Sequence, residues 1–297
     1  LIEMRRCATG LVGKISGAVG AYNAQFGLGL NEVEEKNFEQ TVLKKLGLKP
    51  AIISTQILPP EPLAYFLFSC TAMSATLAQF GRDCRHLMRS EIGEVAESFS
   101  AEQVGSSTMA HKRNPINFEN LEGMYLRTKN EFGKVMDTLI SEHQRDLTGS
   151  SVMRDFPIIV INLQQQLNTL LRADKSGETF LRKIQIDKDR CLSNFNISAD
   201  FIVAEPLYLA LQMAGYTKDA HHLVNHLLMP IAKNNDISLF AALESIADSD
   251  SELRTIVDKI PLEIQMLLKN PYKYTGLAKQ KALEILDLVE KKINNEN

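Results

Sequence analysis

The chain has 297 residues, with 33 Lys and Arg against 36 Asp and Glu, and 44% of its residues are hydrophobic. This length is typical of about two domains with a large buried core, which excludes a small disulfide-stapled scaffold. The net charge of −3 provides no basic excess for a phosphate backbone, so no nucleic-acid partner is expected, and a charged fraction of 23% excludes a disordered chain.

The cysteine pattern favours a reducing cytoplasm, because the four cysteines form no C-x-x-C pair. They lie far apart, at Cys7, Cys70, Cys84 and Cys191. The longest apolar stretch, residues 156–163, is shorter than the ~20 residues of a membrane span, so no membrane partner is expected. The chain begins with Leu1 rather than Met, which indicates part of a longer protein.

Three segments repeat apolar residues at steps of three and four, which is typical of helices in a bundle. The first begins at Pro60 and carries Leu63, Phe66, Cys70, Met73, Leu77, Phe80, Cys84 and Leu87. The second, which Asn114 caps and Pro115 begins, carries Phe118, Leu121, Tyr125, Thr128, Phe132, Val135 and Leu139. The third carries Phe156, Ile159, Leu163, Leu167 and Leu170. The predicted fold class is all-α, a long antiparallel helical bundle.

After Arg172 the pattern changes to shorter helical segments separated by turn residues. We therefore predict a boundary near residue 174, with a central bundle domain over residues 1–174 and a smaller helical C-terminal domain over residues 175–297.

Three common site patterns fail on their spacing. Gly13-Lys14 lacks the first glycine and the following Ser or Thr of a phosphate-binding loop, and residues 17–20 lack the dinucleotide spacing G-x-G-x-x-G. His222 and His226 lie four residues apart, as two zinc ligands could, but the glutamate of H-E-x-x-H is missing. Surface or capping histidines explain this pair better, and we expect no metal and no organic cofactor.

The first candidate for chemistry is the long loop over residues 98–113, between the first two bundle helices. It combines hydroxyls, cations and an imidazole with the N-terminus of a helix, whose partial positive charge and N–H donors suit a carboxylate or an oxyanion. The alternative is a solvated loop in which Asn114 caps the next helix.

A second cluster joins the second and third bundle helices over residues 144–154. If Ser150 begins the third helix, Arg154 lies one turn further on the same face, and Arg145 approaches from the preceding turn. Two guanidiniums and a hydroxyl suit a phosphate. The alternative is a capped helix in which Arg145 pairs with a neighbouring acid.

These clusters resemble known sequences. Residues 105–115 resemble the loop G-S-S-x-M-P-x-K-x-N-P of the fumarase/aspartase superfamily, whose members eliminate fumarate from succinyl-containing substrates. Within it, residues 144–154 resemble the stretch Q-R-D-L-T-x-S-x-x-x-R of the adenylosuccinate lyase family. Residues 54–57 and 13–23 are similar to its stretches T-T-Q-I and G-K-I-x-G-A-V-G-x-Y-N.

The resemblance implies elimination of fumarate from adenylosuccinate, and from the related succinylated carboxamide ribotide, in a homotetramer with shared active sites. It implies that Ser106 is the general base, that Ser107 contributes to binding, and that Lys112 and Asn114 hold the carboxylates. Arg113 would assist as a neighbouring charge. The phosphate would bind to Arg145, Ser150 and Arg154 of the second cluster. The rest of the substrate would contact Gln56 and Asn120.

Two departures from the family pattern are present. Ala110 stands where the family usually has Pro, which changes the cost of ordering the loop. The histidine motif of the family's general acid, which precedes residues 13–23 in the family, does not occur in this chain. Two alternatives remain: another superfamily lyase, of the argininosuccinate lyase or cycloisomerase type, or a non-catalytic helical assembly protein.

Overall fold

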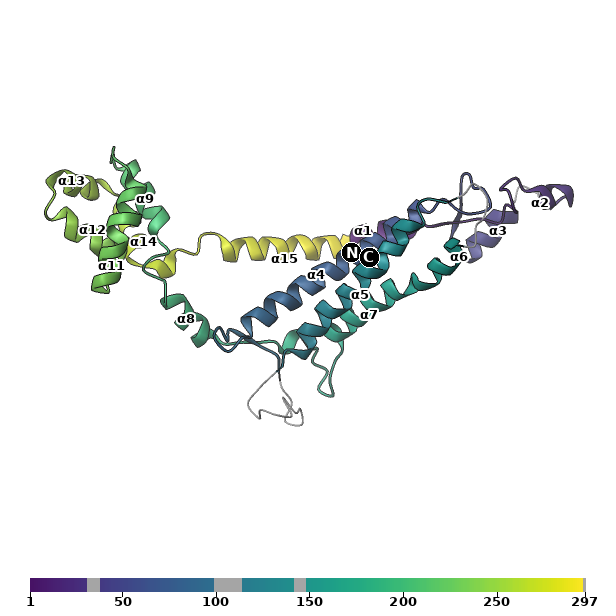
Figure 1. Cartoon of the computed structure of the whole chain (residues 1–297), viewed down its shortest axis with the longest axis horizontal. Coiled ribbons are helices and arrows are strands. Elements are labelled where there is room, and N and C mark those ends of the chain that lie inside the picture. The colour runs from purple at the N-terminus through teal and green to yellow at the C-terminus, as the bar shows by residue number, and fades with distance from the viewer. Residues whose placement is uncertain (31–37, 99–113, 142–147, 296–297) are drawn as a thin grey trace. The chain divides into compact units, whose positions relative to one another are not determined.

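A computed structural model describes residues 1–30, 38–98, 114–141 and 148–295 and contains two compact units, Leu1–Lys188 and Asp189–Asn297 (Figure 1). Residues beyond the predicted boundary at 174 pack with the first unit. Strand β4 (Gln185–Ile186) pairs antiparallel with β3 (Val95–Ala96), and the ring centroid of Phe180 lies 5.6 Å from that of Phe118.

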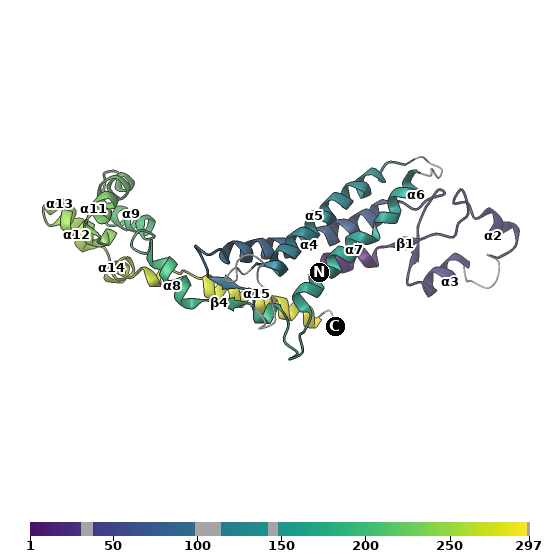
Figure 2. The same cartoon turned by 60° about the horizontal axis from the view of Figure 1, so that its bottom comes forward.

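The first unit is mostly helical, as predicted. Its helices are α1 (Ile2–Thr9), α2 (Asn23–Gly27), α3 (Phe38–Lys45), α4 (Glu61–Leu87), α5 (Ile116–Asp137), α6 (Thr148–Val152) and α7 (Pro157–Leu171), with 3-10 turns η1 (Met153–Asp155) and η2 (Leu181–Lys183). A further short strand pair is parallel, between β1 (Val12–Gly13) and β2 (Lys49–Pro50). The predicted bundle helices are α4, α5 and α7, which run side by side in both views (Figures 1 and 2).

The side of α4 that is most buried differs from the predicted one. Cys70 and Cys84 are buried as expected, whereas the larger predicted residues, such as Phe66 and Leu77, are half-buried. The buried stripe consists mainly of small residues, namely Ala64, Leu67, Ser69, Cys70, Ser74, Ala78, Gly81 and Cys84. Small side chains allow the neighbouring helices to approach closely, so periodicity located the helix but not its closest contact.

The three bundle helices share one buried polar contact. Gln166 of α7 is fully buried, and its side-chain amide donates to the carbonyls of Ser74 in α4 at 3.1 Å and Leu121 in α5 at 2.7 Å. The apolar positions predicted for α5 and α7 are buried at Phe118 and Ile159. The contact with two carbonyls fixes the register of α7 against both partners, because a buried amide without acceptors is costly.

The predicted start of the second bundle helix is wrong. Pro115, not Asn114, occupies the N-cap position of α5, and no side chain there caps the helix. Ser150 lies in the separate short helix α6, and the third bundle helix begins at Pro157, because the turn η1 interrupts the helical path between α6 and α7. Proline at the first position of a helix is favourable, since its missing N–H would have no partner within the helix.

An ion-pair cluster also joins α4 to α5. Arg82 and Arg85 of α4 both bind the carboxylate of Glu122, the second at 2.9 Å. The hydrogen bond from Arg82 lowers the pKa of Glu122 below its ordinary value. Glu122 is largely buried, and its charged form is paired. The ion pairs therefore stabilise the contact between α4 and α5 at pH values above the usual titration range of a carboxyl.

By length and composition alone, α4 could cross a membrane, since it contains an 18-residue window of mean hydropathy 1.3. Core helices of soluble proteins pass the same test. Because α4 packs against α1, α5 and α7 and carries the ion pairs just described, we interpret it as the core helix of the bundle.

The second unit is a cluster of short helices around its own apolar core. They are α8 (Lys188–Asn196), α9 (Ala204–Met213), α10 (Ala220–His222), the π-helix η3 (Leu223–Leu228), α11 (Met229–Asn235), α12 (Leu239–Ala247), α13 (Ser251–Lys259), α14 (Leu262–Lys269), the 3-10 turn η4 (Pro271–Lys273) and α15 (Ala278–Asn295). Local caps define their starts: Asp219, Ser238 and Asp250 each accept backbone N–H bonds from the following turn.

The closest contact between α4 and α5 gives the first testable prediction. A Cβ atom on Gly81 would lie 2.7 Å from the carbonyl oxygen of Phe118 and 2.9 Å from Cβ of Leu121. We expect Gly81→Ala to lower the free energy of unfolding by ~1–3 kcal/mol, because the backbones must move apart. Urea unfolding followed by circular dichroism measures this change.

The matched control is Gly133→Ala in α5, where an added Cβ would meet nothing within 4 Å. There we expect a gain of about 0.5–1 kcal/mol from helix propensity. Equal effects of the two substitutions would contradict the close approach at Gly81.

Candidate active site

The structure describes half of the predicted site residues. Gln56, Asn114, Asn120, Ser150 and Arg154 lie in described segments. The remaining five lie outside the described residues, as does Ala110; these are Ser106, Ser107, Lys112, Arg113 and Arg145.

Two of the segments that carry the resemblance contact each other. The ammonium of Lys14 donates to the carbonyls of Gly17 at 2.8 Å and Gln56 at 2.9 Å, and the hydroxyls of Ser16 and Ser54 lie 2.9 Å apart. Lys14 therefore binds backbone carbonyls within the fold, which agrees with the rejection of a phosphate-binding loop. Through this contact it fixes the backbone at Gln56, a predicted substrate contact.

Gly20 is needed at this contact. Its φ is +73°, and a Cβ atom there would collide with the carbonyl of Ser54. Both the left-handed backbone and the lack of space require glycine. The close approach keeps the segment over residues 13–23 against the segment over residues 54–57.

A buried carboxylate holds the first of these segments from α3. Glu39 is almost completely buried and accepts hydrogen bonds from the backbone N–H of Ile15 and the hydroxyl of Tyr22, both at 2.6 Å. Glu39 also raises the pKa of the Tyr22 hydroxyl above its ordinary value, mainly through this hydrogen bond. No sequence pattern predicted this role, since a lone glutamate in a helical segment is usually a surface residue.

Helix α6, which contains Ser150, lies at the end of the bundle where α5 ends, and the turn η1, which contains Arg154, contacts α5 (Figures 1 and 2). Ser150 is half-buried in α6, and Arg154 is exposed in η1. The neighbouring Asp155 forms an ion pair with Lys134 of α5 at 2.6 Å. Arg154 itself has no acidic partner among the described residues, so its guanidinium is available to an anion.

Asn114 and Asn120 lie at the opposite end of the bundle, where α5 begins. The side-chain oxygen of Asn120 accepts a hydrogen bond of 3.2 Å from Thr169 of α7. Lys134 of α5 pairs with Asp155 of η1 and so shows where η1 contacts α5. Asn120 lies 14 residues before Lys134, which is about 21 Å along the helix axis. Among the described residues, Asn114 and Asn120 therefore do not converge with Ser150 and Arg154 within one copy of the chain.

The N-terminus of α5 is already occupied by a carboxylate of the chain. Glu97, which follows β3, is almost completely buried and accepts the backbone N–H groups of Asn117 at 2.9 Å and Phe118 at 3.0 Å. The side-chain amide of Asn117 donates to its other oxygen at 2.7 Å. In this structure an internal acid, rather than a substrate group, takes these N–H donors of the helix start.

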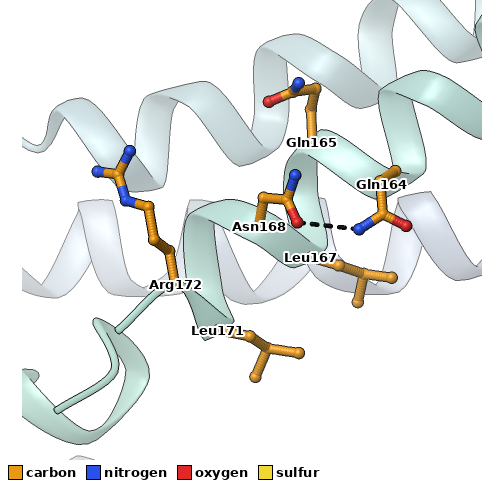
Figure 3. A pocket seen from close by; sticks show the side chains of 6 residues that line it. All are labelled: Gln164, Gln165, Leu167, Asn168, Leu171 and Arg172. Atoms are coloured by element: carbon orange, nitrogen blue, oxygen red, sulfur yellow. Dashed lines mark hydrogen bonds between the residues drawn. The ribbon is translucent and has the colours of Figure 1, made fainter. Parts of the chain in front are cut away.

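Two of the hollows on the described surface of the first unit are large enough to hold a small molecule. One, of about 400 Å³, lies along α7, where Gln164 donates to the side-chain oxygen of Asn168 and Arg172 is the charged residue of the lining (Figure 3). The other, of about 990 Å³, is a mainly apolar groove bordered by α1, α4 and α5. Neither contains a predicted site residue.

The described part of the chain contains no group of three or more His, Cys, Asp or Glu side chains placed to hold a metal ion. His222 and His226 are exposed, their ring centroids lie 4.9 Å apart, and the backbone N–H of His222 donates to Asp219. Burial raises the pKa of the Cys70 and Cys84 thiols, which makes them poor nucleophiles.

Comparison with known proteins points to one group of enzymes. Residues 3–128 match the lyase family. The chain is 35% identical over 287 residues to an adenylosuccinate lyase of Pyrococcus horikoshii, an alignment that covers 94% of this chain and 58% of the relative. It is 32% identical to an adenylosuccinate lyase of Methanocaldococcus jannaschii, with 95% of this chain and 57% of the relative covered. The chain thus spans a little over half the length of these curated relatives.

Solved structures show the same fold at lower sequence identity. A 3-carboxy-cis,cis-muconate lactonizing enzyme from Pseudomonas putida has a TM-score of 0.69 at 23% identity, covering 92% of this chain and 57% of that one. A fumarate lyase from Mesorhizobium sp. BNC1 has a TM-score of 0.69 at 21% identity, covering 92% and 56%. With its helical bundle and its sequence similarity, this chain resembles the lyase family and, over the part of their length that it spans, the adenylosuccinate lyases.

Proposed function

We propose that the protein eliminates fumarate from adenylosuccinate to give AMP, and from the succinylated carboxamide ribotide of purine synthesis. The observation that carries this proposal is the identity of 29–35% to curated adenylosuccinate lyases, together with an exposed Arg154 that has no acidic partner among the described residues. The substrates of argininosuccinate-type and cycloisomerase-type lyases lack the nucleotide phosphate, which is why a phosphate-binding Arg154 favours adenylosuccinate over them.

The chemistry follows from the residues that the resemblance assigns. Ser106 takes the proton from the carbon next to the succinyl carboxylate, negative charge builds on that carboxylate, and the C–N bond to the purine breaks. Lys112 and Asn114 stabilise the charge, and donors aimed at a developing charge contribute ~3–4 kcal/mol each. The leaving nitrogen takes a proton from a general acid, which the family supplies from a histidine motif outside this sequence.

We also propose that the active site is assembled from several copies in a cytoplasmic homotetramer. The distance of about 21 Å along α5 between the two groups of site residues supports shared sites, because side chains at opposite ends of one bundle cannot hold one small substrate. Large exposed apolar side chains on the bundle, including Tyr65, Phe68 and Ile161, support contact between copies. Reduced, unpaired cysteines in the described structure support a reducing compartment.

We expect Ser106→Ala in the full-length protein to lower kcat for fumarate release at least ~10²-fold while substrate binding is nearly unchanged, because the substitution removes the base but no carboxylate ligand. Stopped-assay fumarate release and substrate titration measure the two effects. Turnover within tenfold of the parent would contradict the role of Ser106 and transfer it to Ser107, for which Ser107→Ala is the matched variant.

We expect Arg154→Lys to weaken AMP binding by ~1.5–3 kcal/mol, since an ammonium cannot reproduce the two parallel hydrogen bonds of a guanidinium to phosphate. Calorimetric titration with AMP measures this change. Arg172→Lys, at the other exposed arginine near α7, is the control and leaves the dissociation constant unchanged. Equal affinity in the Arg154 variant would favour the lyases whose substrates lack a phosphate.

We expect light scattering to show that the chain is an oligomer, and we expect Phe68→Glu to lower the molar mass of the assembly. Phe68 is 56% exposed on α4, beside the apolar groove, and a carboxylate there would have to be buried between copies. The control Leu262→Glu introduces the same charge at a residue of α14 that is 70% exposed. A monomeric parent would contradict the shared active site.

A further inference from the structure

Glu97 has a geometry that the proposed chemistry does not use. In α5, Asn117 and Phe118 occupy the second and third helical positions, whose N–H groups an N-cap side chain normally accepts. The carboxylate that accepts both is not at the N-cap but 20 residues before Asn117, after β3. Glu97 is therefore the cap of α5, supplied from a distant part of the sequence.

The surroundings of Glu97 both oppose and stabilise its buried carboxylate. Burial raises the pKa of its carboxyl, and the hydrogen bonds from Phe118 and Asn117 act in the opposite direction. The titratable groups that face it are Glu119 of α5 and Cys84 of α4. An acid is buried at this position at a cost, and three donated hydrogen bonds together with the positive end of α5 offset that cost.

The contact also joins the two ends of one stretch of sequence. Residues 98–115, between the cap and the helix that it caps, contain the complete stretch over residues 105–115 that resembles the superfamily loop. One buried side chain thus fixes where this stretch leaves β3 and where it enters α5.

We propose that Glu97 is a positioning residue for the elimination. It holds the start of α5, and with it Asn114, against β3. This inference rests on the proposed function. Glu97 does not touch the substrate; it acts through the backbone of Asn117 and Phe118, and a small misplacement of catalytic groups is enough to cost up to ~10²-fold in rate.

The test compares Glu97→Ala with Glu97→Gln in the full-length protein. Glutamine keeps an oxygen for the two backbone N–H groups, and the Asn117 amide can turn to accept from its nitrogen. We expect Glu97→Ala to lower kcat for fumarate release ~10–100-fold with the dissociation constant for AMP within twofold, because Arg154 lies at the other end of the bundle. Glu97→Gln is expected to recover kcat to within about threefold of the parent.

The control is Asp250→Ala, which removes a cap with two equivalent backbone bonds, to Glu252 and Leu253 at 3.0 Å, from α13 in the second unit. It is expected to leave kcat within about twofold of the parent. If Glu97→Ala does not fold, Glu97→Asp, which is one methylene shorter, replaces it and is expected to lose kcat as well. Amide hydrogen exchange of Asn117 and Phe118 reports the cap without reference to activity, and is expected to rise in Glu97→Ala alone.

Three results would overturn the proposal. They are a Glu97→Ala variant with kcat within threefold of the parent, a Glu97→Gln variant as impaired as Glu97→Ala, and an Asp250→Ala variant with an equal loss of kcat. A parent protein without fumarate release would overturn the proposed function and the positioning role with it, whereas faster amide exchange in Glu97→Ala would still identify Glu97 as the cap.

Discussion

The close crossing of α4 and α5 at Gly81 and Phe118 is the contact on which the bundle depends. Phe118 is completely buried; its carbonyl lies against Gly81, its N–H donates to Glu97, and its ring contacts Phe80 and Phe180. One residue thus connects the helix pair, the β3–β4 pair and the start of α5. A side chain at Gly81 would displace all of these elements at once, because a densely packed interior cannot accommodate an extra methyl group by a local shift.

This crossing also determines where chemistry can be placed. Because α4 and α5 are long and antiparallel, the end of α5, with α6, lies at one end of the pair, and the start of α5, which follows Asn114, lies at the other (Figure 2). A long bundle makes such a separation unavoidable, since each helical residue adds ~1.5 Å to the distance. In the shared active sites that we propose, each end of a bundle would contribute one half of a site.

The sequence predicted the elements better than the contacts between them. Apolar periodicity located α4, α5 and α7, because a helix that buries one face must repeat every three or four residues. It did not identify the small-residue stripe of α4, since the distance between two packed helices also depends on the side chains of the partner helix. Glu39 and Glu97 were also missed, because a buried acid is recognisable only from the N–H groups that surround it, and those come from other segments.

Asn114 is not the N-cap of α5, and this has a consequence for its chemical role. A side chain that caps a helix points its oxygen at the N–H groups of the next turn, and a side chain that holds a substrate carboxylate must point its N–H donors outward. One asparagine cannot satisfy both requirements in the same orientation. Because Glu97 supplies the cap, the first turn of α5 does not require the amide of Asn114. The buried acid thus makes the role that the resemblance implies for Asn114 compatible with a stable helix start.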